Sequence, residues 1–134
     1  MELTEKLKHL EENIKILREI KVSVTLGELI SNKRYEWEVR YGLLESIQMV
    51  IDIACKLSSQ YNLGNPKNYR ACLALLQQHK YLSPKLAKKM ISMVGLRNLI
   101  VHEYAEIDNK KLYEFLNFLD DFVDFSIEIG EHPA

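Results

Sequence analysis

Residues 35–61, YEWEVRYGLLESIQMVIDIACKLSSQY, decide the fold class of this chain. Apolar side chains recur here at steps of three or four residues: Tyr35, Val39, Leu43, Ile47, Val50, Ala54, Leu57 and Tyr61. Such steps place one apolar stripe along a helix of about 3.6 residues per turn. We therefore expect the longest helix of the chain in this stretch.

The stretch before it repeats the same pattern. Leucine and isoleucine recur at the same steps between Leu3 and Leu17, which predicts a helix from about Thr4 to Val24. Residues 25–34 contain Thr25, Gly27, Ser31 and Asn32, so we expect a short irregular or helical link there.

Three further helices are expected after residue 61. Asn65 and Pro66 resemble an N-cap and first-turn pair, which predicts a helix reaching about His79. Ser83 and Pro84 repeat this signal before a helix over 85–101, and Asp108 is a suitable cap for a last helix. The apolar face of that last helix is rich in aromatic residues: Leu112, Phe115, Leu116, Leu119, Phe122 and Val123.

These patterns predict an all-α fold. No alternating apolar stretch is long enough to compete as a strand, and 134 residues are the size of one domain. We expect residues 1–134 to form a single domain, an antiparallel helical bundle of about five helices with short connections.

The amino-acid composition and the first residues indicate where in the cell this protein is expected. Apolar residues make up 47% and charged residues 28% of the chain, and no apolar run approaches the roughly 18 residues of a membrane span. The first residues, MELTEKLKHLEEN, lack the apolar core of a signal peptide. We expect a cytoplasmic protein that does not enter a membrane.

Cys55 and Cys72 lie in apolar surroundings without close spacing, so we expect buried thiols rather than a disulfide or a metal site.

Charge is segregated along the chain although the net charge is only -1. Residues 53–102 contain no Asp or Glu but eight cations: Lys56, Lys67, Arg70, Lys80, Lys85, Lys88, Lys89 and Arg97. Residues 103–134 contain nine acids against Lys110 and Lys111. The pattern fits a surface that attracts a phosphate backbone, and it equally fits an acidic helix packed against the basic segment.

Arg97 is the most unusual residue of the helix expected over 85–101. It projects onto the apolar side of that helix, where an unpaired charge costs several kcal/mol unless it snorkels to solvent or meets a carboxylate, a symmetric partner or an anion. His102 follows five residues later, about 140° around an ideal helix. The two side chains can serve one site only if the helix distorts or a second subunit contributes.

The segment Gly95–Tyr104, GLRNLIVHEY, resembles the Arg-x4-His-x-Tyr signature of the HepT-like toxins of the HEPN superfamily. The long helix over 35–61, Pro66-x-x-Tyr69-Arg70, Val94-Gly95-Leu96 and Ile107-Asp108 are similar to the same family.

This resemblance implies a helical bundle that forms a symmetric homodimer, with two copies of the motif facing each other across a cleft. It also implies metal-independent cleavage of RNA without a cofactor. His102 is then the base that accepts a ribose 2′-hydroxyl proton, and Arg97 binds the phosphate. Asn98 supports them, whereas Arg70, Lys88 and Lys89 are weaker candidates for RNA binding. DNA, which lacks the 2′-hydroxyl, is not expected to be cut.

The resemblance further implies a protein partner. HepT-like toxins are encoded with a minimal nucleotidyltransferase antitoxin of the MntA type, and Tyr104 is the hydroxyl on which such an enzyme would place AMP. A phosphate added beside Arg97 would occupy the anion site and repel RNA. Tyr104 is therefore expected to be a modification site and an off switch. It is also a supporting candidate that contacts the RNA, and the alternative is a tyrosine that only packs.

Two other interpretations stay open. In the first, the chain is a non-catalytic HEPN protein that binds nucleotide or a nucleotidyltransferase partner. In the second, it is a purely structural helical dimer whose interface is the Leu3–Leu17 stripe or the phenylalanine-rich last helix, and the motif has no role.

Overall fold

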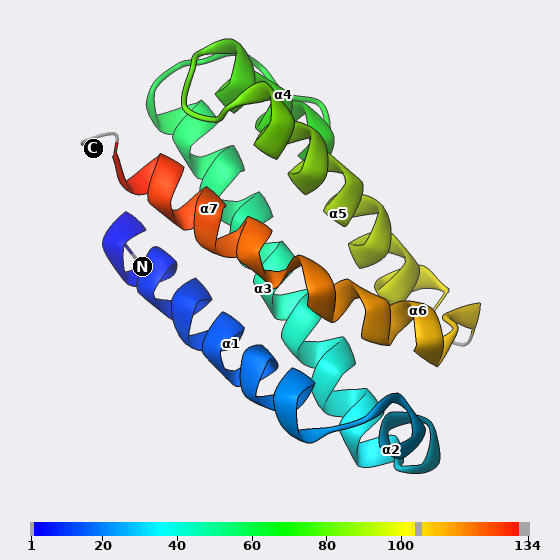
Figure 1. Cartoon of the computed structure of the whole chain (residues 1–134). Helices are drawn as coiled ribbons and strands as arrows, with labels where there is room; N and C mark the ends of the chain where they lie inside the picture. Colours follow the sequence, from blue (N-terminus) through cyan, green and yellow to red (C-terminus); the bar gives the residue numbers. More distant parts are fainter. Residues whose placement is uncertain (1, 104–105, 132–134) are drawn as a thin grey trace.

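The computed structural model describes residues 2–103 and 106–131, and these residues contain helices but no strand. Figure 1 shows the long helical segments side by side, each running opposite to the one before it. They are α1 (Leu3–Ser23), α3 (Lys33–Gln60), α5 (Pro84–His102) and a final segment of α6 (Asn109–Glu114), η2 (Phe115–Phe118) and α7 (Leu119–Gly130). The shorter helices α2 (Leu26–Ser31) and α4 (Tyr69–Gln78) lie at opposite ends of the bundle. The predicted all-α antiparallel bundle is confirmed.

Side-chain caps set several helix starts. The side chain of Ser83 accepts a hydrogen bond from the Leu86 N–H at 3.3 Å, and Pro84 occupies the first turn of α5, as expected. Asp108 caps α6 by accepting from the Lys110 N–H at 3.0 Å. The expected link over 25–34 contains α2, which begins with a reciprocal capping box between Thr25 and Glu28. Each cap satisfies N–H groups that the helix itself leaves unpaired.

The predicted start of α4 at Asn65 and Pro66 was wrong. The helix begins at Tyr69, and the side chain of Asn68 accepts a hydrogen bond from the Ala71 N–H at 2.8 Å. Asn68 has the same capping chemistry as Asn65 but lies directly before the first helical residue, which is where a cap must stand. Asn65 and Pro66 belong to the connection between α3 and α4.

The last predicted helix is interrupted. Residues Phe115–Phe118 tighten into a 3₁₀ turn between α6 and α7. In a 3₁₀ turn, side chains three residues apart eclipse, and the Phe115 and Phe118 rings pack edge to face at 6.1 Å between centroids. Periodicity alone did not distinguish this turn from a continuous helix.

The core lies between the long helices. Helix α1 packs against α3 and α7, and α5 packs against α3 and α4. Gly42 allows α1 to approach α3 closely, because a Cβ at this position would lie 2.7 Å from Leu17 Cδ2. The buried hydroxyls of Ser46 and Ser58 donate to carbonyls one turn earlier, at 2.7 Å and 2.9 Å, so they are satisfied inside the core.

Cys55 on α3 and Cys72 on α4 form a disulfide, with Cα atoms 4.9 Å apart. The expectation of two separate buried thiols was therefore wrong. The chain reverses between α3 and α4, and this reversal places both positions across one helix contact. A sequence separation of 17 does not reveal that proximity.

Among the described residues, none of the helices has the length and hydropathy needed to cross a bilayer.

Candidate active site around Arg97 and His102

Arg97 is half-buried near the end of α5, and two neutral amides hold it. Its Nε donates a hydrogen bond to Oε1 of Gln48 on α3 at 3.1 Å. Its Nη1 donates to Oδ1 of the adjacent Asn98, also at 3.1 Å. These two contacts fix the guanidinium between α3 and α5.

The amide of Gln48 is itself oriented. Its Nε2 donates to Oδ1 of Asp52, one turn further along α3, at 2.9 Å. Because the nitrogen faces Asp52, the oxygen faces Arg97. The result is a hydrogen-bonded chain from Asp52 through Gln48 and Arg97 to Asn98.

Helix α4 contributes the remaining neighbours. The guanidinium carbon of Arg97 lies over the ring of Tyr69, 5.2 Å from its centroid, which is within the range of a cation–π contact. The next residue, Arg70, reaches α5 at Gly95, where a Cβ would lie 3.6 Å from Arg70 Nη2. Arg70 is exposed. The start of α4 therefore brings an aromatic ring and a second arginine to the part of α5 that contains Arg97.

No carboxylate pairs with Arg97 within residues 2–103 and 106–131, where the ion pairs involve other cations. Sequence reasoning required such a charge to snorkel to solvent or to meet an acid, a symmetric partner or an anion. The observed partners are amide oxygens, which orient a guanidinium without cancelling its charge. The arrangement leaves a positive centre suited to an anionic ligand.

His102 is the last residue of α5 and is exposed. The part of the chain that the structure describes offers its ring no hydrogen bond or ion pair, and the adjacent Val101 is 39% exposed. Helix α5 continues without interruption from Arg97 to His102, so the two side chains point about 140° apart. One copy of the chain does not bring the two residues together.

The other predicted site residues fall into three groups. Asn98 is half-buried and supports Arg97 directly. Lys88 is exposed on α5, whereas the ammonium of Lys89 pairs with the buried carboxylate of Asp121 on α7 at 3.1 Å. Tyr104 lies outside the described residues. The Lys89–Asp121 pair indicates that the acidic C-terminal segment neutralises part of the basic segment.

Sequence reasoning missed Gln48. Gln48 lies on the helix that the apolar stripe of residues 35–61 predicts. Its position in that stretch is no different from that of a glutamine facing solvent. Tyr69 was quoted only as part of a family resemblance, without its contact to Arg97. Both contacts depend on how α3 and α4 pack against α5.

A second polar cluster connects α1 and α3. Oε1 of Glu45 accepts from Nδ2 of Asn13 at 3.0 Å and contacts Nε2 of His9. The hydrogen bond from Tyr41, followed by that from His9, lowers the pKa of the Glu45 carboxyl below its ordinary value of 4.5. The same carboxylate raises the pKa of the Tyr41 phenol. This cluster lies on a different helix pair from Arg97.

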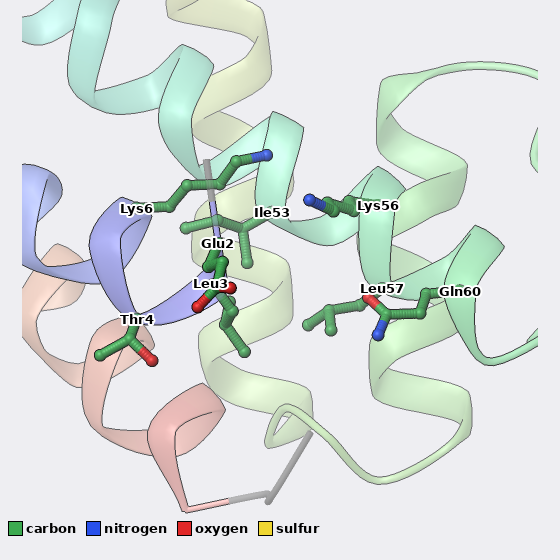
Figure 2. Close-up of a pocket in the computed structure, with 8 residues that line it drawn as sticks. All are labelled: Glu2, Leu3, Thr4, Lys6, Ile53, Lys56, Leu57 and Gln60. Carbon is green, nitrogen blue, oxygen red and sulfur yellow. The ribbon is translucent and has the colours of Figure 1, made fainter.

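A pocket of about 390 Å³ opens between the start of α1 and the end of α3 (Figure 2). Its lining combines Lys6 and Lys56 with the acidic Glu2 and apolar side chains such as Leu57, and it includes none of the neighbours of Arg97. Over the described ranges, no three His, Cys, Asp or Glu side chains gather closely enough to hold a metal ion.

The sequence of this chain is similar to those of known proteins. Residues 10–129 match the profile of the family described as Ribonuclease HepT-like. The mRNA nuclease HepT of Shewanella oneidensis is 36% identical over 85 residues, which cover 63% of this chain and 64% of the relative. The tRNA nuclease HepT of Aphanizomenon flos-aquae is 37% identical over 98 residues, covering 72% of this chain and 65% of the relative. Each match therefore spans just under two thirds of the curated relative's length.

Solved structures share the fold over nearly the whole chain. The tri-AMPylated HEPN toxin of Shewanella oneidensis, in complex with an MNT antitoxin, superposes with a TM-score of 0.88 at 25% identity, covering 98% of this chain and 100% of that one. The cytosolic protein YutE of Bacillus subtilis, of unknown function, has a TM-score of 0.73 at 15% identity, covering 92% and 87%. The latter likeness concerns the fold alone.

Proposed function

The chain belongs to the HepT-like family of the HEPN superfamily, and from this premise we propose that it is a metal-independent endoribonuclease toxin of a cytoplasmic toxin–antitoxin pair. One observation supports this proposal most directly. The Arg97 guanidinium is half-buried and oriented, yet its hydrogen-bond partners are the neutral amides of Gln48 and Asn98. A cation held in this way is suited to a phosphodiester, whose two free oxygens match the guanidinium fork.

His102 is the proposed general base. A neutral imidazole nitrogen accepts a proton from the ribose 2′-hydroxyl. The 2′-oxygen then forms a bond to the adjacent phosphorus, and the bond from phosphorus to the 5′-oxygen of the next nucleotide breaks. A 2′,3′-cyclic phosphate remains, and the 5′-oxygen takes up a proton from water and leaves as a hydroxyl. Arg97 stabilises the negative charge that develops on the phosphoryl oxygens. The exposed position of His102 supports this role because RNA can reach the ring.

A symmetric dimer resolves the separation of the two residues. Within one copy, Arg97 and His102 point about 140° apart along an uninterrupted helix. A two-fold axis beside the end of α5 would bring Arg97 of one protomer near His102 of its partner. The exposed Val101 offers apolar surface for such a contact. Analytical ultracentrifugation tests this part, with a dimer as the expected species.

RNA contacts beyond the scissile phosphate are assigned to exposed cations near Arg97. Arg70 lies against Gly95 on the same helix contact, and Lys88 is exposed on α5. Lys89 is the weakest of the three because Asp121 already binds its ammonium. Their contribution is electrostatic and should decrease with salt.

Regulation by a nucleotidyltransferase antitoxin completes the proposal. The similar Shewanella toxin is tri-AMPylated and bound to its MNT antitoxin, which supports a partner of the same class for this chain. We assign Tyr104 as the acceptor hydroxyl. An AMP phosphate two residues from His102 would add negative charge where RNA must bind and would block cleavage.

Incubation of the purified protein with total RNA in EDTA tests the activity. The expected result is fragmentation by the wild-type protein, loss of at least about 100-fold in rate for His102→Ala, and no change for His79→Ala, at the C-terminal cap of α4. Arg97→Met should abolish cleavage while the fold persists. RNA that stays intact with wild-type protein, while a nucleotidyltransferase still binds, would favour the non-catalytic interpretation. Unchanged cleavage by Arg97→Met would contradict the assigned site.

A further inference from the structure

The contacts of Arg97 assign a role to a residue on another helix. We propose that Gln48 is a positioning residue, which holds the Arg97 guanidinium ready for an RNA phosphate without neutralising it. This inference rests on the proposed function and adds a component to it. Gln48 itself does not touch the reacting atoms.

The direction of the hydrogen bond is the first argument. Gln48 Oε1 accepts from Arg97 Nε at 3.1 Å, while Asn98 Oδ1 accepts from Nη1. A guanidinium has five N–H groups, so three have no hydrogen-bond partner within the described ranges. Those remaining groups suffice for a bidentate phosphate contact.

The chemistry of the acceptor is the second argument. A carboxylate at position 48 would reach Arg97 Nε equally well, but its negative charge would offset the positive charge of the guanidinium and weaken the attraction for a phosphate. An amide oxygen supplies the orientation alone. Asn98 is also an amide, so both side-chain acceptors of Arg97 are neutral.

The fixed orientation of the Gln48 amide is the third argument. Its Nε2 donates to Asp52 Oδ1 at 2.9 Å, so rotation of the amide by 180° would break this bond and turn an N–H toward the guanidinium. Asp52 thus keeps Oε1 of Gln48 directed at Arg97. The Gln48 side chain separates the negative charge of Asp52 from the guanidinium. Two residues of α3 therefore hold a cation of α5 in place.

A merely structural role predicts different behaviour. If Gln48 only tied α3 to α5, a Gln48→Glu substitution would keep the tie through an ion pair with Arg97 that offsets the lost hydrogen bond to Asp52, and cleavage would not change. If Gln48 keeps Arg97 available for phosphate, the same substitution should lower RNA affinity in a protein that is still folded. The substitution thus separates stability from activity.

The experiment compares RNA cleavage by the wild-type protein, Gln48→Glu and Gln48→Met as a function of salt, with thermal unfolding of each. For Gln48→Glu we expect kcat/KM to fall by roughly 10–100-fold. The slope of log KM against log salt should become shallower by about 0.7, the value of one lost phosphate contact on a single strand. The thermal unfolding transition should show that Gln48→Glu remains folded at the assay temperature, although it lacks the hydrogen bond to Asp52.

Gln48→Met keeps the side-chain volume and adds no charge. It should lower kcat by a few-fold, through loss of orientation, and leave the salt slope unchanged. Gln78→Glu on the exposed end of α4 provides the matched charge control and should behave as wild type.

Wild-type values of kcat, KM and salt slope for Gln48→Glu would overturn the inference while leaving the nuclease assignment intact. Absence of any His102-dependent cleavage by the wild-type protein would overturn the proposed function and this inference with it.

Discussion

Arg97 on α5 lies directly over the ring of Tyr69 on α4, with 5.2 Å between the guanidinium carbon and the ring centroid. Tyr69 is 41% exposed, so the contact lies at the edge of the candidate site rather than in the core. The electron density of the Tyr69 ring attracts the cation, and this contact leaves the N–H groups of Arg97 available for hydrogen bonds. Arg97 therefore has one aromatic neighbour and two amide partners, none of which carries a negative charge.

Tyr69→Leu should weaken RNA cleavage, because the cation–π attraction that helps to hold Arg97 is removed. A contact of about 0.5–1 kcal/mol at an exposed site corresponds to a loss of about two- to fivefold in kcat/KM. Tyr69→Phe retains the ring face and should remain within twofold of wild type. Steady-state kinetics on one RNA substrate measures both, and an equal loss in both variants would indicate a role for the hydroxyl instead.

The Glu45 cluster should make stability depend on pH. Hydrogen bonds lower the pKa of this carboxyl in the folded state, so its ionised form stabilises the fold at any pH above its ordinary value of 4.5. That stabilisation is lost as pH falls below 4.5 and through the lower folded-state pKa. Glu45→Gln should therefore reduce the free energy of unfolding near pH 7 by about 1 kcal/mol or less.

Chemical denaturation of the Glu45→Gln variant and the wild type at pH 7 and pH 3 tests this prediction. The difference between the two proteins should shrink toward zero at the lower pH. Glu19→Gln, on the exposed surface of α1, removes the same charge and should show no such difference. A difference that persists or grows at pH 3 would mean that the cluster acts through packing instead.

Reduction should destabilise the protein, because Cys55–Cys72 closes a loop with a separation of 17 residues. A crosslink of that span contributes about 3 kcal/mol, mainly by restricting the unfolded chain. Dithiothreitol should lower the unfolding temperature of the wild type and leave that of a Cys55→Ala/Cys72→Ala variant unchanged. Two titratable thiols in the oxidised wild-type protein would rule out the bond.

Gly42→Ala should destabilise the packing of α1 on α3, since the added Cβ would lie 2.7 Å from Leu17 Cδ2. Leu17 is itself buried, so it has little room to move. We expect a loss of about 1–3 kcal/mol in the free energy of unfolding, the usual cost of overpacking. Gly130→Ala meets no atom within 4 Å and should be neutral or slightly stabilising. Urea denaturation of the two variants makes the comparison, and equal stabilities would refute the close approach.

Local sequence patterns predicted which segments of the chain are helical. The apolar stripe of residues 35–61 became α3, and Ser83 with Pro84 started α5 as expected, because periodicity and capping depend on neighbours a few positions apart. The break at Phe115–Phe118 and the cap at Asn68 instead of Asn65 were not predicted. In both places the local pattern fits more than one helix boundary, so it does not fix where the helix starts or tightens.

The sequence alone determined which residues are chemically unusual: a guanidinium on an apolar helix face and an imidazole five positions later, in an order that is similar to one family. Only the tertiary structure decided what surrounds them. Gln48 and Tyr69 reach Arg97 from 49 and 28 positions away, and Cys72 reaches Cys55, because separate helices fold against one another. Such contacts depend on the crossing of helices in space, whereas periodicity records only which side of each helix faces inward.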